Sequence, residues 1–285
     1  MNDNKFKQIP RSVKKLKQLE SLDLSHNKIK RIPRFIKKMS CLKELKLNYN
    51  QLNNLKKTEI KRLKNLESIQ VGFNNISTLP NNIEELSKLK VLNLGKNNLH
   101  SVPKNFQLLD SLEHLIFYRN HFDSIPPEIF KLTSLKELDF YHNNIKNIPD
   151  EIKNLKQLEQ LYLAYNQINN IPISVITLES LMAIYLHHNF IIAVPNRIVE
   201  MQNLVFLDLG YNKIFEVPDM SGMPSLKEID LQENNLAEFP YELLENKNLT
   251  HIYLMGNTFV LTDAEKEEME KRQKELLEIG VRIYF

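Results

Sequence analysis

The chain has 285 residues, of which 42% are hydrophobic and 26% charged, and its formal net charge is +3. Its six glycines form neither a G-x-x-x-x-G-K-S/T nor a G-x-G-x-x-G segment, and its single cysteine, Cys41, excludes an intramolecular disulfide and a cysteine-rich metal site. No long apolar run predicts a membrane span, and no apolar secretory core lies near the start. We therefore expect a cytoplasmic protein, with a secreted or surface effector as the alternative.

Residues 1–18 match only the second half of a motif that recurs along the rest of the chain. Ile9-Pro10 and Val13 are the matching apolar positions. We expect this segment to form a partial repeat or an N-terminal cap, and we place full repeats in residues 19–261. Terminal repeats are often atypical, which favours a natural partial cap over the alternatives of a truncated longer chain or an edge covered by a partner.

An asparagine recurs every 22 to 24 residues within a constant frame, L-x-x-L-x-L-x-x-N-x-I/L. The asparagines are Asn27, Asn50, Asn74, Asn97, Asn120, Asn143, Asn166, Asn189, Asn212, Asn234 and Asn257. Two leucines separated by one residue point to the same face of a strand, and an asparagine amide can bond backbone groups in the turn that follows. The frame predicts about eleven short strands and a buried structural ladder that includes Asn97, Asn120, Asn143, Asn166, Asn189 and Asn212.

The second half of most repeats carries an apolar residue followed by proline, as at Ile148-Pro149. Proline lacks an N–H, so this pair predicts an extended segment outside the sheet. Further apolar pairs, such as Ile152 and Leu155, predict an inward-facing helical or 3₁₀ turn. The repeat after Asn50 has no such proline and carries one extra residue, which predicts an irregularity at residues 56–60.

Residues 262–285 predict a C-terminal cap. The run Thr262-Asp263-Ala264-Glu265 is a capping box, and the helix that it opens should extend to about Leu277, with Gly280 at its C-cap. Met269, Leu276 and Leu277 are then available to cover the last repeat. A closing strand is expected at residues 281–285.

The frame resembles that of the typical 23-residue class of leucine-rich repeat proteins, of the bacterial and intracellular type. The resemblance extends from Phe6 to Phe285. It implies an α/β fold: a curved horseshoe solenoid with a parallel sheet of about eleven strands on its concave face, short helical or 3₁₀ segments on its convex face, and a C-terminal capping helix. It also implies binding of other macromolecules on the concave face, without specifying the partner.

Eight of the ten tyrosines lie at variable positions beside the second leucine or just before the asparagine, which should face the concave side. Aromatic residues suit strands and fill space between repeats, which is one interpretation. They are also enriched at binding hot spots, and we favour this second interpretation. The predicted partner-binding residues are Tyr118, Tyr141, Tyr162, Tyr165, Tyr185, His188, Phe206 and Tyr211.

Charge is distributed unevenly. Residues 1–65 hold 19 Lys and Arg against 5 Asp and Glu, a net of +14, whereas the remainder carries −11. The later concave positions carry only acidic charge, which indicates a partner with basic residues. The basic N-terminal part, including Lys56, Lys57, Lys61, Arg62 and Lys64, supports an alternative adaptor for nucleic acid or anionic membrane. Head-to-tail self-association is a third interpretation, and the oligomeric state stays open.

The repeat frame does not bring histidine and carboxylate side chains together in a catalytic or metal-binding arrangement. His187 and His188 are adjacent and should diverge, while Glu228 and Asp230 alternate on an exposed face where solvated charge explains them. We therefore predict no catalytic residues, no metal site and no cofactor. The sequence predicts a non-enzymatic module that binds a protein or peptide.

Overall fold

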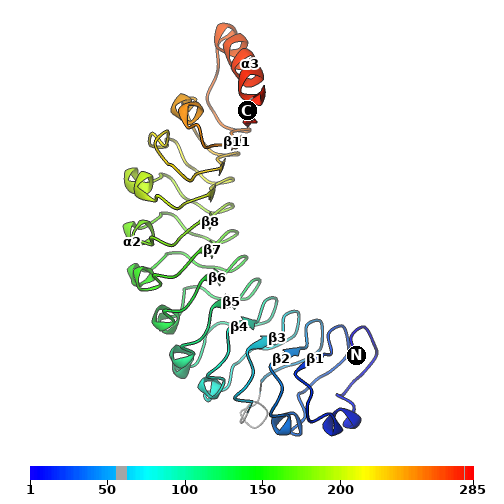
Figure 1. Cartoon of the computed structure of the whole chain (residues 1–285). Coiled ribbons are helices and arrows are strands. Elements are labelled where there is room, and N and C mark those ends of the chain that lie inside the picture. The colour runs from blue at the N-terminus through cyan, green and yellow to red at the C-terminus, as the bar shows by residue number, and fades with distance from the viewer. Residues whose placement is uncertain (56–62, 279) are drawn as a thin grey trace. The chain divides into compact units, whose positions relative to one another are not determined.

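The structure, a computed structural model, describes residues 1–55, 63–278 and 280–285 (Figure 1). It divides into two compact units, unit 1 at Met1–Asn144 and unit 2 at Ile145–Phe285. The irregularity predicted at residues 56–60 lies outside the described residues. Unit 1 holds 26 Lys and Arg against 14 Asp and Glu, a net of +12, and unit 2 holds 12 against 21, a net of −9. The two units therefore carry opposite charge.

The described residues of unit 1 form six strands that pair in parallel with their neighbours in chain order. The strands are β1 (Ser21–Asp23), β2 (Glu44–Lys46), β3 (Ser68–Gln70), β4 (Val91–Asn93), β5 (His114–Ile116) and β6 (Glu137–Asp139). Short 3₁₀ helices lie in the return segments. They are η1 (Arg11–Lys15), η2 (Ile36–Lys38), η3 (Ile83–Glu85), η4 (Lys104–Leu108) and η5 (Pro127–Lys131).

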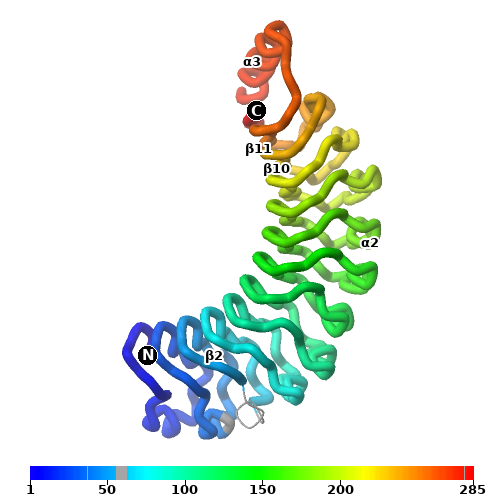
Figure 2. The backbone as a smooth tube through the Cα atoms, turned by 180° about the vertical axis from the view of Figure 1, so that it is seen from behind, coloured from blue at the N-terminus to red at the C-terminus, as the bar shows by residue number. Residues whose placement is uncertain are grey.

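Unit 2 repeats this plan with six further parallel strands in its described part. The strands are β7 (Gln160–Tyr162), β8 (Ala183–Tyr185), β9 (Phe206–Asp208), β10 (Glu228–Asp230), β11 (His251–Tyr253) and β12 (Arg282–Tyr284). The helices are η6 (Asp150–Asn154), α2 (Ile173–Ile176), η7 (Asn196–Glu200), η8 (Tyr241–Glu245) and α3 (Asp263–Glu278). Within this unit the strands lie on one side of the stacked coils and the short helices on the other (Figures 1 and 2).

Alternation of side chains explains the strands. In β7 the middle residue, Leu161, is fully buried, while Gln160 and Tyr162 point to the opposite face. Every described strand has a buried middle residue. We call the surface formed by the first and third residues of each strand the strand face; it corresponds to the concave face of the sequence-based expectation.

In most return segments the proline lies directly before a short helix, although among the described residues no helix directly follows Pro218. Pro149 has an extended backbone, and its carbonyl oxygen accepts a hydrogen bond from the Ile152 amide at 3.1 Å. The carbonyl of Ile152 then accepts from the Leu155 amide at 3.0 Å, and both side chains are fully buried. The predicted inward-facing turns are thus confirmed.

The asparagines tie each coil to the preceding one. The Asn189 amide nitrogen donates to the carbonyls of Leu186 and His187 in its own coil, and to the carbonyl of Leu163 one coil earlier. Its side-chain oxygen accepts from the Ile168 amide at 2.9 Å. The six asparagines Asn97, Asn120, Asn143, Asn166, Asn189 and Asn212 are all buried, whereas Asn257 near the C-terminus is only half-buried.

The C-terminal segment forms helix α3 and strand β12. The Thr262 amide donates to the Glu265 carboxylate at 2.7 Å and the Glu265 amide donates to the Thr262 hydroxyl at 3.3 Å, which is the reciprocal pair of a capping box. Met269 and Leu276 are buried as expected, but Leu277 is 58% exposed and does not cover the last repeat. Leu277 lies on the solvent side of the amphipathic helix, next to the buried Leu276.

Candidate partner-binding site

The third residues of the unit 2 strands form a column in register on the strand face. The pairing aligns Tyr162 with Tyr185, Tyr185 with Asp208, Asp208 with Asp230, Asp230 with Tyr253 and Tyr253 with Tyr284. We call this set the strand column. Two tyrosine pairs therefore flank two carboxylates on adjacent strands.

The tyrosines of the strand column stack closely. The ring centroids of Tyr162 and Tyr185 are 4.6 Å apart with an interplanar angle of 2°, and those of Tyr253 and Tyr284 are 4.9 Å apart at 3°. The spacing is close to the distance of about 4.8 Å between neighbouring strands. Stacked rings present a rigid apolar surface on each side of the carboxylates.

The two carboxylates are fixed by hydrogen bonds to the turns that follow their strands. Asp208 accepts from the Gly210 amide, and its other oxygen lies 2.7 Å from Nδ1 of His187. Asp230 accepts from the Gln232 amide at 2.9 Å and from the Gln232 side chain at 2.8 Å. These contacts hold both carboxylates in place on the strand face.

Burial raises the pKa of Asp230 to about 6, and the negative charge of Asp208 adds to this rise, although the hydrogen bond from the Gln232 amide opposes it. This result corrects the sequence-based interpretation of Asp230 as an ordinary solvated charge. The pKa of Tyr185 is also raised, first by burial and then by the charges of Asp208 and Glu228. The middle of the column is therefore a half-buried site of negative potential.

A second aromatic column lies beyond the strand ends, where Tyr165, His188 and Tyr211 each precede a ladder asparagine. Their ring centroids are separated by 4.0 Å and 4.2 Å. Each residue has a left-handed backbone, with φ between 53° and 55°. Burial lowers the pKa of His188, and so does the neighbouring His187. We call these three residues the turn column.

The left-handed residue is a general feature of the repeat. Such a conformation is unusual for a bulky side chain, yet it recurs before the described ladder asparagines. The turn swings the next residue inward, which places the asparagine in the ladder. In unit 1 the corresponding residues His26, Tyr49 and Phe73 also stack, at 4.2 Å and 4.0 Å.

The structure separates the eight predicted partner-binding residues into groups. Tyr118 and Tyr141 belong to unit 1, where their ring centroids are 5.6 Å apart. Tyr162 and Tyr185 lie in the strand column, whereas Tyr165, His188 and Tyr211 form the turn column. Phe206 is the first residue of β9 and is 39% exposed. The sequence-based set omitted Asp208, Asp230 and Tyr253 of the strand column, although the frame marks their positions.

Among the residues that the structure describes, no group of three or more His, Cys, Asp or Glu side chains is arranged to hold a metal ion. No helix in the described ranges is long and apolar enough to cross a membrane.

The leucine-rich repeat family model matches residues 1–52, 40–99, 64–122 and 118–168, which together span more than half of the chain. The chain therefore belongs to the leucine-rich repeat family. A search of curated proteins finds no significant match.

Three solved structures illustrate the similarity. A leucine-rich repeat protein of Leptospira interrogans is 26% identical, with a TM-score of 0.52 over 100% of this chain and 94% of its own. The ectodomain of the Arabidopsis thaliana receptor kinase GASSHO1/SCHENGEN3, in complex with CASPARIAN STRIP INTEGRITY FACTOR 2, is 30% identical, with a TM-score of 0.73. The plant peptide hormone receptor RGFR1, in complex with RGF2, is 26% identical, with a TM-score of 0.65.

The extent of these matches differs. This chain aligns over 88% of its length to the GASSHO1/SCHENGEN3 structure and 87% to RGFR1, but covers only 31% and 49% of those chains. Leucine-rich repeat neighbours thus include receptors that bind a protein or peptide ligand on this fold.

Proposed function

We propose that unit 2 binds a protein or peptide on its strand face, with a Lys or Arg side chain of the partner lying over Asp208 and Asp230. The observation that carries this proposal is the strand column, in which two carboxylates in register are flanked by stacked tyrosine pairs. The binding of protein ligands by neighbours of the same fold supports it. The module acts by binding and performs no catalysis.

The charges of the strand face favour a basic partner. The first and third residues of the described strands of unit 2 include Asp208, Glu228 and Asp230 against one Lys or Arg, Arg282 on the end strand β12. A cation over these carboxylates would gain charge-assisted hydrogen bonds. Its aliphatic stem could pack against the rings of Tyr185 and Tyr253, and an arginine could also stack on them.

The tyrosines supply the apolar part of the contact. Tyrosine offers a large rigid surface at low cost in conformational entropy, and aromatic residues dominate binding hot spots. Because Tyr162 and Tyr185 are already stacked, the partner would meet a preorganised surface. The turn column of Tyr165, His188 and Tyr211 would extend the interface beyond the strand ends.

The proposal is tested by selecting ligands from a displayed library of random peptides. The full chain serves as bait, and the variant Tyr162→Ala/Tyr185→Ala is used for counter-selection. We expect the enriched peptides to contain Lys or Arg next to apolar residues. Calorimetric titration of one such peptide should show a loss of at least about thirtyfold in affinity for the variant, since truncating even one hot-spot aromatic costs about 2 kcal/mol.

Tyr49→Ala is the matched control, because Tyr49 is an exposed, stacked tyrosine of unit 1. It should leave the peptide affinity unchanged. If the wild type and the strand-column variant bind the peptide with equal affinity, and circular dichroism shows that both are folded, the strand face is not the binding site.

The basic N-terminal part provides the alternative function, binding of nucleic acid or an anionic membrane. Unit 1 carries a net charge of +12, and exposed residues such as Lys5, Lys7 and Arg11 contribute to it. Of the basic patch predicted near residue 60, Lys64 alone lies in the described ranges. Binding to heparin that disappears at physiological salt would favour this function, whereas contacts with buried aromatic rings should persist.

A further inference from the structure

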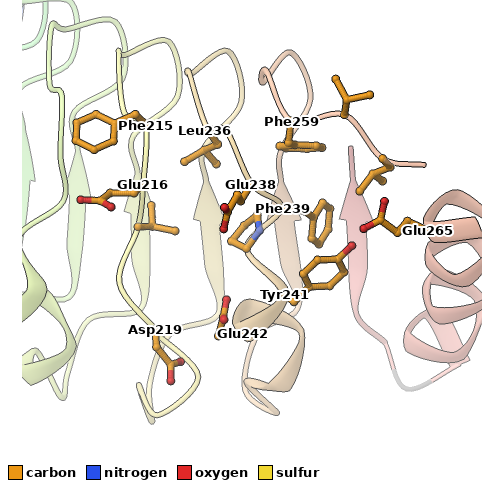
Figure 3. A pocket seen from close by; sticks show the side chains of 15 residues that line it. Phe215, Glu216, Asp219, Leu236, Glu238, Phe239, Tyr241, Glu242, Phe259 and Glu265 are labelled. Atoms are coloured by element: carbon orange, nitrogen blue, oxygen red, sulfur yellow. The ribbon is translucent and has the colours of Figure 1, made fainter. Parts of the chain in front are cut away.

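A groove of about 700 Å³ lies in unit 2, away from the strand face, along three successive return segments (Figure 3). Its lining comes from the segments that follow Asn212, Asn234 and Asn257, together with the start of α3. We call it the flank groove. None of the predicted partner-binding residues lines it.

The flank groove has an aromatic floor. Phe239 is 5% exposed, and its ring centroid lies 4.9 Å from Tyr241 and 5.2 Å from Phe259. Phe215 and Tyr241 remain 49% and 43% exposed at its sides. The Phe215 amide donates a hydrogen bond to the carbonyl of Ile192 in the preceding repeat, and Ile192 is 54% exposed.

Exposed apolar side chains are concentrated in unit 2. Of the seventeen large hydrophobic residues that are exposed in the described part of the chain, thirteen belong to unit 2 and four to unit 1. Single exposed hydrophobic residues are ordinary, but contiguous patches mark interaction surfaces. The flank groove contains such a patch in a hollow, which favours insertion of an apolar side chain.

Acidic residues surround this floor. The lining includes Glu216, Asp219, Glu238, Glu242 and Glu265, but no Lys, Arg or His. Glu265 caps α3. The pKa of Tyr241 is raised mainly by burial and further by the negative charge of Glu265. None of the other four carboxylates makes an ion pair within the described ranges. The groove is therefore complementary to a cationic segment that carries an apolar residue.

Such a segment is present in unit 1. Residues 11–17 carry Arg11, Lys14, Lys15 and Lys17 without an acidic residue, and all four are exposed. Leu16 lies among them and is 49% exposed. Val13 is fully buried and anchors η1 to its own unit, which leaves the cations and Leu16 at the surface.

We propose that the flank groove of one copy of this chain binds residues 11–17 of a second copy. In this contact Leu16 packs on the ring of Phe215, and the lysines face the carboxylates of Glu216 and Glu238. The surfaces differ, so after binding one copy keeps a free segment and the other keeps a free groove. The contact is heterologous, and association can continue beyond a dimer.

Sedimentation velocity of the full chain tests the proposal. At about 50 mM salt, the weight-average mass should rise with chain concentration and exceed that of a dimer. At about 500 mM salt the mass should fall towards the monomer, because exposed charges are then screened within a few ångströms. A constant monomer mass up to about 100 μM at low salt would overturn the proposal, since an interface with a Kd of about 10 μM would be largely formed there.

Two variants define the surfaces. The groove variant is Phe215→Ala/Glu216→Gln/Glu238→Gln, and the segment variant is Lys14→Gln/Leu16→Ala/Lys17→Gln. Each variant should be monomeric alone, because each lacks one half of the contact. A mixture of the two should form a 1:1 heterodimer and nothing larger, because only one native pair of surfaces remains. Self-association of the groove variant at the wild-type level, or absence of the heterodimer, would contradict the assignment.

The variant Asp208→Asn/Asp230→Asn is the control for general acidity. It removes two carboxylates from the strand face of the same unit and leaves the flank groove intact. Its mass distribution should match that of the wild type. Loss of self-association in this variant would place the contact on the strand face and overturn the proposal.

Discussion

The ring of Tyr162 on β7 lies parallel to the ring of Tyr185 on β8, with 4.6 Å between centroids. Such pairs contribute about 0.5–1.5 kcal/mol beyond the area that they bury. A double-mutant cycle with Tyr162→Ala and Tyr185→Ala should therefore give a coupling free energy of this size. Chemical denaturation of the wild type, both single variants and the double variant measures it.

A cycle between Tyr162 and Tyr253 provides the comparison. Three strands, β8 to β10, lie between the strand of Tyr162 and the strand of Tyr253, so the rings do not touch and the two free-energy changes should add. Equal coupling in both cycles would show that the tyrosines act through the whole unit instead of through direct stacking.

The asparagine ladder predicts a gradient of stability within unit 2. Asn189 is buried and makes four hydrogen bonds to backbone groups, whereas Asn257 is half-buried and makes three. Asn189→Ala leaves buried backbone partners unsatisfied and should lower the free energy of unfolding by at least about 2 kcal/mol. Asn257→Ala should cost less, because water can reach the freed groups. Equal midpoints in urea for the two variants would count against this account.

The left-handed backbone before each ladder asparagine gives a third prediction. Glu233 has a φ of 52° and is exposed. Glu233→Gly removes the steric cost of this conformation, about 1 kcal/mol or more, and part of that gain is offset by the greater freedom of the unfolded chain. The melting temperature should stay level or rise slightly. Glu233→Val should lower it, because a β-branched residue tolerates this region poorly; the same melting temperature for both variants would contradict the prediction.

The alternating leucines were sufficient to predict the strands, because one buried face with a period of two leaves little freedom in register. Leu161 illustrates this, since it is buried where the frame places it. The prolines identified the return segments for a similar reason. Pro149 cannot donate a hydrogen bond to a sheet, and the structure places it just before η6.

The grouping of the tyrosines could not be predicted in the same way. Tyr162 lies between the two leucines and Tyr165 just before the asparagine; the frame places both on the same face, but the left-handed backbone at Tyr165 places it in a different column. No glycine marks that turn in most repeats, so the sequence carries no sign of it. The flank groove was also missed, because Phe215, Glu216 and Glu238 lie outside the repeated frame and meet only when the coils stack.

Asp230 gives the last prediction, a dependence of stability on pH. Its folded pKa of about 6 lies above the value of about 3.9 for an unfolded aspartate. Between these values the folded chain binds more protons than the unfolded chain, so this group lowers the free energy of unfolding as the pH rises through that range. Above about pH 6 the full penalty of the ionised, half-buried carboxylate is present.

Asp230→Asn should remove that penalty while keeping an acceptor oxygen for the Gln232 amide. The variant should therefore be more stable than the wild type at pH 8, and the difference should shrink as the pH falls to about 4. Urea denaturation at pH 4, 6 and 8 measures the difference. Asp219→Asn is the control, because hydrogen bonds from Ser221 lower the pKa of Asp219, so its contribution to stability has the opposite sign. If the wild type has the larger free energy of unfolding at pH 8, the hydrogen bonds of the carboxylate on the strand face outweigh the cost of its burial.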